Sequence, residues 1–267
     1  MARSLKLGLI QMDCRLKDKK YNVEKAVAMA KEAAHKGAEL VVLPELFNTG
    51  YHPLVIGKEW FDLAEDYNGP TVQKMCELAC SLGIYIVAPL AFQSELTGVI
   101  QNSSLLIDDQ GQIIGKHDKI QLWATEALFF KAGREFKVFP TKWGKVGLLV
   151  CYDVLFPELV RKFALKGAEL LVLSAAWRDI EEDIWDTVLP ARALENTIFL
   201  AGINRVGVEE ELKMFGKGTI VNPRGHVLKH GPANKEYILV HEIDLDDVSE
   251  NRKELYYLKD IRMELYY

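Results

Sequence analysis

Cysteine is scarce in this sequence of 267 residues: there are four, at positions 14, 76, 80 and 151, and none forms a CxxC pair. No histidine-rich segment accompanies them, so the sequence indicates neither a zinc site nor a framework of disulfides. Long hydrophobic runs are also missing, and the amino terminus lacks the apolar core of a signal peptide. We therefore expect a cytoplasmic protein with no metal site and no membrane contact.

Clusters of positive charge are missing as well. Acidic residues are interleaved with every group of lysines and arginines, the formal net charge is -5 and the pI is near 5.8. Binding of nucleic acid is therefore not expected, because it depends on concentrated positive charge. What is present is an ordinary globular composition, 49% hydrophobic and 27% charged, with enough length for a substantial core. We expect one domain over residues 1–267.

Apolar runs alternate with segments of helical spacing along the chain. Residues 5–12 predict a strand, and Asn22 is placed to cap a helix that Gly37 ends. Pro70 and Pro157 each stand where a further helix would begin. This alternation predicts an α/β fold. The turn-like DQG between two apolar runs adds a hairpin, so a mixed sheet is expected.

One pattern occurs twice, as KGAELVVLPE at 36–45 and KGAELLVLSA at 166–175. Each copy is a helix stop followed by an apolar strand. The repetition fits two similar halves. It also fits coincidence, because Gly-Ala-Glu-Leu is chemically unsurprising at a junction between a helix and a strand.

The stretch LLVCYDVLFPELV, residues 148–160, places Cys151 at the carboxyl end of an apolar run. A buried and inert thiol would normally lie inside such a run. In open α/β sheets the crevice beyond the carboxyl ends of the strands is where ligands bind. Cys151 is therefore a candidate for a reactive group, whereas Cys14, Cys76 and Cys80 are expected to be small core or groove residues.

Three charged residues could assist such a thiol. Glu45 lies just past a predicted strand, either in a pocket or as an acid on a surface loop. Lys119 follows the predicted hairpin, and Glu126 lies among apolar residues where burial would demand a partner. A thiol nucleophile needs a base or a positive charge, and none of the six histidines occurs in a papain-like context. A glutamate and a lysine could serve instead.

These segments carry a family resemblance. PELFNTGY, GKHDKIQLW with the following TEALFFKAG, and GLLVCYDVLFPELVR resemble, in that order, the three signature regions of the nitrilase, or carbon-nitrogen hydrolase, superfamily. Later segments, among them SAAW, NRVG and GKGTIVNPRGHVL, resemble further blocks of that family. The similarity therefore covers essentially the whole chain. It implies a four-layer αββα sandwich with two mixed β-sheets, which associates through a helical layer into a dimer.

The resemblance also implies roles for single residues. Glu45 would be the general base, Lys119 the group that stabilises the transition state, and Cys151 the nucleophile. Glu126 would be a second structural or catalytic glutamate. The chain departs from the family at Gln121, where many members have a histidine two residues after the lysine, and this affects the expected polarity of the pocket.

The pair Tyr152-Asp153 resembles amidase-type members more than nitrilases, which tend to follow the cysteine with Trp-Glu or Gly-Glu. The family then implies hydrolysis of a small amide through a cysteine thioester, with release of ammonia and a carboxylic acid and with no cofactor. An N-carbamoyl amine or amino-acid hydrolase, with a ureido substrate, and a nitrilase are the alternative enzymes. A catalytically silent binding protein of the same fold is the alternative outside enzymes.

Some neighbouring side chains are candidates for the pocket wall. Tyr51, Tyr152 and Trp177 lie in or beside the signature segments and could bind substrate or serve only in packing. Arg178 could meet a substrate carboxylate. It could equally be a surface residue beside Asp179 and Glu181.

The chain ends in LYYLKDIRMELYY, which is rich in tyrosine and leucine. Aromatic residues are favoured at interfaces, so we expect the tail, from about residue 246, to lie at the interface of a homodimer or a larger even-numbered assembly. A tail folded back on its own subunit is the alternative. The residues concerned are Tyr256, Tyr257, Leu258, Met263, Leu265, Tyr266 and Tyr267.

Overall fold

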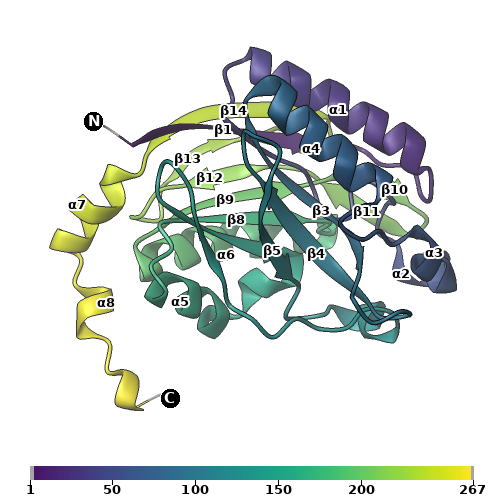
Figure 1. Ribbon diagram of the computed structural model, residues 1–267. Coiled ribbons are helices and arrows are strands. Elements are labelled where there is room, and N and C mark those ends of the chain that lie inside the picture. The colour runs from purple at the N-terminus through teal and green to yellow at the C-terminus, as the bar shows by residue number, and fades with distance from the viewer. Residues whose placement is uncertain (1–2, 266–267) are drawn as a thin grey trace.

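The chain folds into an αββα sandwich, the architecture that the family resemblance implies. This computed structural model describes residues 3–265 (Figure 1). Two six-stranded sheets pack face to face, and each carries helices on its outer face. Both sheets are mixed, because each has parallel strands at its centre and antiparallel strands at its edges. The central strands are buried on both faces, which accounts for their nearly continuous apolar sequence.

The first sheet is built from the amino-terminal half and one late strand. Its parallel pairs are β1 with β2 and β2 with β3, and its other pairs are antiparallel. Helices α1 and α4 make the two crossovers. The strand order is β14 (Tyr237–Asp244), β1 (Ser4–Gln11), β2 (Leu40–Val42), β3 (Tyr85–Gln93), β4 (Ile100–Ile107), β5 (Ile113–Asp118), and the helices are α1 (Lys19–His35) and α4 (Pro70–Leu82).

The second sheet repeats this plan. Its parallel pairs are β7 with β8 and β8 with β9, again with helices as crossovers. The strand order is β13 (Val227–His230), β12 (Thr219–Val221), β9 (Phe199–Asn204), β8 (Leu170–Ala175), β7 (Lys145–Val150), β6 (Val138–Pro140), and the helices are α5 (Pro157–Leu165) and α6 (Glu182–Asn196). Smaller elements surround the sandwich: α2 (Pro53–Ile56), α3 (Trp60–Leu63), β10 (Val206–Glu209) and β11 (Leu212–Phe215).

The repeated ten-residue pattern has the same structural role in both sheets. Strand β2 comes from the first copy and β8 from the second, and each is the middle strand of its parallel trio. Gly37 and Gly167, which precede them, have φ of 89° and 91°, a backbone conformation that favours glycine. This correspondence favours two similar halves over coincidence.

Alternation along the strands divides the core into layers. In β8, Leu170 and Val172 pack between the two sheets, whereas Leu171 and Leu173 face the other way, into the cluster under α5 and α6. An equivalent outer cluster lies under α1 and α4. A sheet with two apolar faces needs a cover on each, and the helices supply it.

Helix α1 starts earlier than the sequence suggested. Asp18 caps it, with its side chain accepting a hydrogen bond from the backbone of Tyr21. Asn22 lies inside the helix and is fully buried. Its amide donates to the carbonyl oxygens of Arg15 (2.7 Å) and Asn48 (3.0 Å). Asn22 therefore joins two loops instead of capping the helix, and the apolar face alone could not show this.

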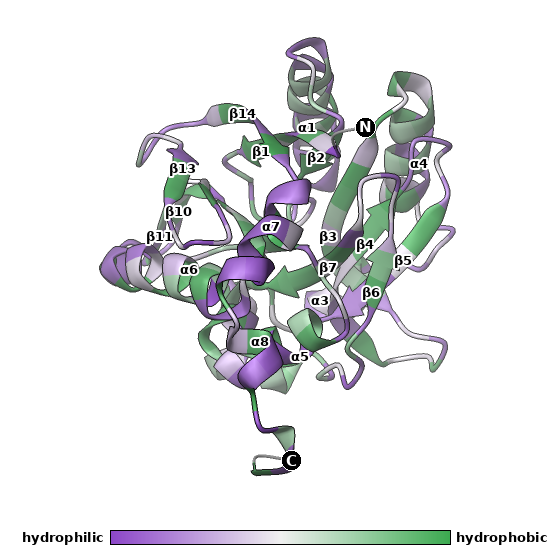
Figure 2. Cartoon of the chain, turned by 90° about the vertical axis from the view of Figure 1, so that its left-hand side faces the viewer, coloured by the Kyte–Doolittle hydropathy of each residue, from purple (hydrophilic) through white to green (hydrophobic). Residues whose placement is uncertain are grey.

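The carboxyl-terminal tail extends along and then away from the body of the protein (Figures 1 and 2). It contains α7 (Asp246–Glu254), which is strongly hydrophilic, and α8 (Tyr257–Asp260). Tyr266 and Tyr267, included in the predicted interface, lie outside the described residues.

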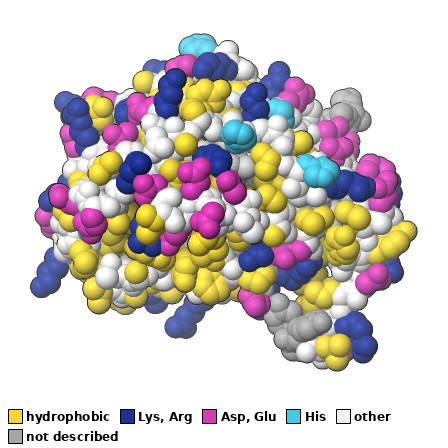
Figure 3. Space-filling view, turned by 180° about the vertical axis from the view of Figure 1, so that it is seen from behind, with side chains coloured by type: hydrophobic (Ala, Val, Ile, Leu, Met, Phe, Trp, Pro, Cys, Tyr) yellow, Lys and Arg dark blue, Asp and Glu magenta, His cyan; other side chains and the backbone are white. Residues whose placement is uncertain are grey.

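On the face seen in Figure 3, acidic and basic side chains are interspersed. Within residues 3–265, no helix is both long and apolar enough to span a bilayer.

The space between the sheets provides a test of the fold. Leu7 on β1 is fully buried there. We expect Leu7→Ala to lower the free energy of unfolding by about 2–5 kcal/mol, because the cavity that it leaves cannot fully collapse. Denaturant unfolding measures this. The matched control is Leu228→Ala on β13, where the side chain is 39% exposed. Equal losses in the two variants would contradict the assigned core.

Candidate active site

Glu45 lies in the turn after β2 and is completely buried. One oxygen, Oε1, accepts hydrogen bonds from Asn102 Nδ2 (2.7 Å) and from Lys119 Nζ (2.8 Å). The other, Oε2, accepts from the backbone amide of Ala176 (2.9 Å). One donor lies on β4 and the other two lie just after β5 and β8, and together they fix this carboxylate. The alternative of a solvated loop acid is excluded.

Lys119 follows β5 and is also completely buried. Its ammonium group donates to Glu126 Oε1 at 2.7 Å in addition to Glu45. Glu126 in turn accepts from the hydroxyl of Tyr51 (2.7 Å) and the backbone amide of Trp123 (2.9 Å). The burial and partners expected for Glu126 are therefore present. Lys119 lies between two carboxylates, and all three side chains are fully buried.

Burial and charge act against each other within this cluster. Burial alone lowers the pKa of Lys119, but the carboxylates of Glu126 and Glu45 outweigh it and hold that pKa above its ordinary value. Burial raises the pKa of Glu126, and Lys119 opposes that rise. Lys119 therefore stays protonated over the physiological pH range. A group that is to stabilise negative charge must keep its own positive charge.

Cys151 stands directly after β7, at the start of a 3₁₀ turn, residues 151–155. Its φ of 48° is in the left-handed region, which is uncommon for a residue with a side chain. Such strain persists where the surroundings impose it and is concentrated at functional sites. Here the strained backbone belongs to the residue that sequence analysis selected as the nucleophile.

The thiol of Cys151 is almost fully buried beside the charged cluster. Burial raises its pKa well above the ordinary value; Glu45 and Glu126 add to this rise, and Lys119 opposes it. The thiol is therefore protonated near neutral pH. A reaction at this sulfur needs a base at the moment of attack.

Asp153 anchors the turn that carries Cys151. Its carboxylate accepts hydrogen bonds from the backbone amides of Val150 (3.1 Å), Ile120 (3.1 Å) and Gln121 (2.8 Å). The ring Nε2 of His117 lies 3.0 Å from the second carboxylate oxygen. The side chains of Asp153 and His117 are both fully buried. One carboxylate thus ties the segment that follows Lys119 to the turn of the nucleophile.

A second buried carboxylate supports the opposite wall. Glu209 on β10 accepts hydrogen bonds from the backbone amides of Tyr51 (2.9 Å) and His52 (2.8 Å). Glu209 is itself paired with the buried guanidinium of Arg205. This pair fixes the loop from which the Tyr51 hydroxyl reaches Glu126. Glu209 therefore acts on the site through Tyr51.

Cys151 opens into a cavity of about 40 Å³. The three predicted wall residues, Tyr51, Tyr152 and Trp177, all line it, and so does Arg178. Drug-sized ligands occupy pockets of about 300–1,000 Å³, so this cavity suits a ligand of few atoms. The other lining residues, not selected from the sequence, are Trp123, Leu155, Ala176, Glu181 and Ile184.

Sequence reasoning missed Asn102, Asp153 and His117 as parts of the site. A signal existed for Asn102, because it stands among polar residues in a strand with apolar ends, where buried polar groups need partners. Asp153 was used only as part of the Tyr152-Asp153 pair that resembles amidase-type members. His117 gave no local signal, since its partner lies 36 residues further along the chain.

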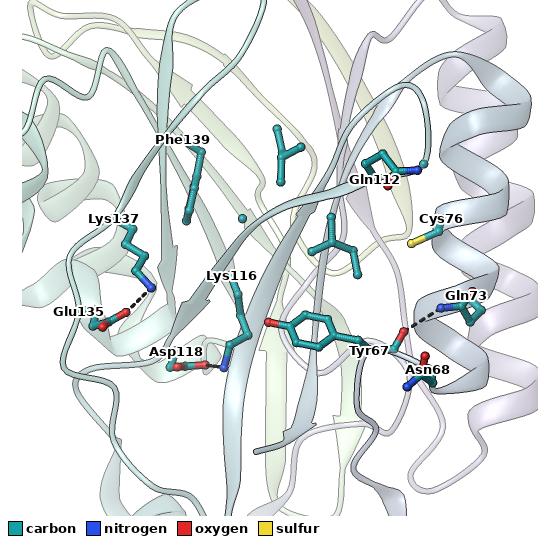
Figure 4. Close-up of a pocket in the computed structure, with 14 residues that line it drawn as sticks. Tyr67, Asn68, Gln73, Cys76, Gln112, Lys116, Asp118, Glu135, Lys137 and Phe139 are labelled. Carbon is teal, nitrogen blue, oxygen red and sulfur yellow. Dashed lines mark hydrogen bonds and ion pairs between the residues drawn. The ribbon is translucent and has the colours of Figure 1, made fainter. Parts of the chain in front are cut away.

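A larger groove of about 850 Å³ lies elsewhere, between α4 and strands β5 and β6 (Figure 4). Its cationic side chains are already paired, Lys116 with Asp118 and Lys137 with Glu135. Cys76 lines this groove, as expected of a groove residue. None of the residues around Cys151 borders it.

Within residues 3–265, no group of three or more His, Cys, Asp or Glu side chains is placed to hold a metal ion.

Comparison with known proteins agrees with this fold. The model of the carbon-nitrogen hydrolase family matches residues 6–253. A nitrilase from Pyrococcus abyssi is 36% identical over 96% of this chain and 100% of its own length. A 2-oxoglutaramate amidase from Bacillus subtilis is 34% identical over 97% and 98%.

A solved structure is similar over nearly the whole chain. It is a mutant of the amidase from Nesterenkonia sp. AN1, with 30% identity, a TM-score of 0.85, and coverage of 98% of this chain and 95% of that one. It carries a covalent addition of the acetamide moiety of fluoroacetamide at its active-site cysteine. The fold and these matches define a hydrolase of the nitrilase superfamily. The chain belongs to the carbon-nitrogen hydrolase family.

The anchoring role of Asp153 can be tested through stability. We expect Asp153→Asn to lower the free energy of unfolding by at least about 2 kcal/mol, because an amide cannot accept all the hydrogen bonds and leaves buried donors unpaired. Thermal and denaturant unfolding measure the loss. Asp62→Asn, at an exposed position on α3, is the control. Indistinguishable stabilities of the two variants would refute the anchor.

Proposed function

We propose that this protein hydrolyses a small amide through a thioester on Cys151, releasing ammonia and a carboxylic acid. The observation that carries the proposal is the buried ammonium of Lys119, held between Glu45 and Glu126 beside a thiol that faces a small cavity. No cofactor is needed for this chemistry.

The first step uses the raised pKa of the thiol. Because Cys151 keeps its proton in the resting site, Glu45 accepts that proton as the sulfur attacks the carbonyl carbon. The carbonyl π electrons move to oxygen, and a tetrahedral intermediate forms. Its oxyanion is stabilised by Lys119 together with the backbone amide of Tyr152.

The second step expels the nitrogen. The oxyanion collapses, the carbon–nitrogen bond breaks, and Glu45 gives its proton to the leaving nitrogen, which departs as ammonia. A water molecule then attacks the thioester while Glu45 again serves as base, which gives the carboxylic acid and the free thiol. Glu126 contributes by holding Lys119, and Tyr51 by holding Glu126.

The choice of an amide over a nitrile is supported by two observations. The residues after Cys151 are Tyr152 and Asp153, which resemble amidase-type members, and a structural relative is an amidase with an acetamide adduct on its cysteine. A nitrile needs an added water before ammonia can leave. The relatives also include nitrilases, and an N-carbamoyl substrate would use the same groups on a ureido carbon. The intact buried cluster opposes a silent binding protein.

The nucleophile is tested by substitution. We expect Cys151→Ala to abolish release of ammonia from small amides, with a fall of at least about 10⁴-fold in kcat, because no other group can form the thioester. Circular dichroism should show an unchanged fold. Cys80→Ala, at an exposed position on α4, should keep full activity.

Matched amide and nitrile substrates then test the subclass by their kcat/KM values. The amide should be the better substrate. Substantial turnover by Cys151→Ala would refute the proposed nucleophile. A nitrile converted to its acid faster than the matching amide would refute the amidase and leave the thioester intact.

We also propose that two copies associate through the tail and the outer helices. Tyr256 and Tyr257 are 53% and 48% exposed, and Leu265 is 61% exposed, so the described tail leaves apolar area in water. Tyr257 borders a groove together with residues of α5 and α6. A second copy would cover this area.

Light scattering at micromolar concentration tests the association, and a dimer or a larger even-numbered assembly is expected. The double variant Tyr256→Ser with Tyr257→Ser should shift toward the monomer, because it removes aromatic area that association would bury. Phe61→Ser, at a 40% exposed position on α3, is the control. A wild-type protein that remains monomeric would overturn this proposal. It would favour the alternative of a tail folded back on its own subunit.

A further inference from the structure

The wall of the cavity above Cys151 is mostly apolar. Trp123, Leu155, Trp177 and Ile184 supply aromatic and aliphatic surface. A wall of this kind contributes to binding through burial of apolar area and offers few polar partners. The acyl part of a substrate must therefore find its complement among these side chains.

Two charged side chains also line the cavity, Arg178 and Glu181, and they neutralise each other. Arg178 Nη2 donates to Glu181 Oε1 at 2.5 Å. Contacts to the two tryptophans fix both residues. The guanidinium carbon of Arg178 lies 4.7 Å from the centroid of the Trp123 ring, and Trp177 Nε1 donates to the carbonyl oxygen of Glu181 at 3.2 Å.

We propose that the Arg178–Glu181 pair restricts this enzyme to amides whose acyl group is short and uncharged. This inference rests on the proposed amidase function. It names the substrate class of that same site and gives Arg178 and Glu181 the role of specificity-determining residues.

The reason is the cost of an unbalanced charge. A carboxylate on the acyl group would compete with Glu181 for Arg178 and bring a second negative charge beside it. An ammonium group would compete with Arg178 for Glu181 in the same way. Either ion would lose water without gaining a free counter-ion. A neutral acyl group leaves the pair intact, and the small cavity limits its length.

A free arginine would have the opposite effect, because a guanidinium binds carboxylates through several hydrogen bonds. In this proposal, the pairing with Glu181 is what withholds the charge of Arg178 from such a substrate. The side chains of Arg178 and Glu181 are only 28% and 29% exposed, so solvent screens their mutual attraction less than that of a surface pair.

Three short primary amides test the proposal: propanamide, which is neutral, succinamate, which carries a carboxylate, and 3-aminopropanamide, which carries an ammonium group. The quantity measured is kcat/KM for release of ammonia, compared between substrates within one variant. Such ratios are independent of the fraction of active enzyme. We expect the wild type to prefer propanamide over both charged amides by about tenfold or more.

Breaking the pair should redirect this preference. Glu181→Gln frees Arg178, so the ratio of succinamate to propanamide should rise by about tenfold or more. Arg178→Gln frees Glu181, so the ratio for 3-aminopropanamide should rise instead. Glu250→Gln removes an exposed pair with Lys253 on α7 and should leave all ratios unchanged.

The outcomes separate this inference from the function on which it depends. A wild type that hydrolyses succinamate or 3-aminopropanamide as well as propanamide would overturn the inference and leave the amidase standing. Unchanged ratios in both Glu181→Gln and Arg178→Gln would also overturn it. If no amide releases ammonia from any form of the protein, the proposed function fails and takes the inference with it.

Discussion

The candidate site depends on a single buried arrangement, the ammonium of Lys119 between the carboxylates of Glu45 and Glu126. Removing any one of these ions from water is costly, and only their mutual attraction and a full set of hydrogen bonds can offset that cost. The surrounding donors complete the set: Asn102 and the Ala176 amide for Glu45, and Tyr51 and the Trp123 amide for Glu126. Each wall of the site is therefore bound to the cluster.

This arrangement needs both sheets of the sandwich. Glu45 and Lys119 follow strands of the first sheet, whereas Cys151 and Ala176 follow the neighbouring strands β7 and β8 of the second. The site forms where strand ends of the two sheets meet, and Asp153 ties the segment after Lys119 to the turn of Cys151. The core between the sheets thus holds the site residues of the first sheet beside those of the second.

Much of this could be predicted from local patterns and from the family resemblance. The helix starts at Pro70 and Pro157, the hairpin around DQG and the strand-end position of Cys151 all followed from neighbouring residues. The contacts that fix the site did not, because they join residues far apart in the chain, such as Asp153 with His117 or Glu209 with Tyr51. Asn22 failed as a cap for a similar reason, since one of its partners, Asn48, lies 26 residues further along the chain. The roles of Glu45, Lys119, Glu126 and Cys151 stay predictions.

During turnover, the sulfur of Cys151 should carry the acyl group of the amide. Rapid acid quenching of the protein with a small amide, followed by intact-mass measurement and peptide mapping, tests it most directly. We expect a transient mass increase equal to the acyl group, located on the peptide that contains Cys151 and formed together with a first equivalent of ammonia. Steady release of ammonia with no adduct at Cys151, or with an adduct at another residue, would contradict the account.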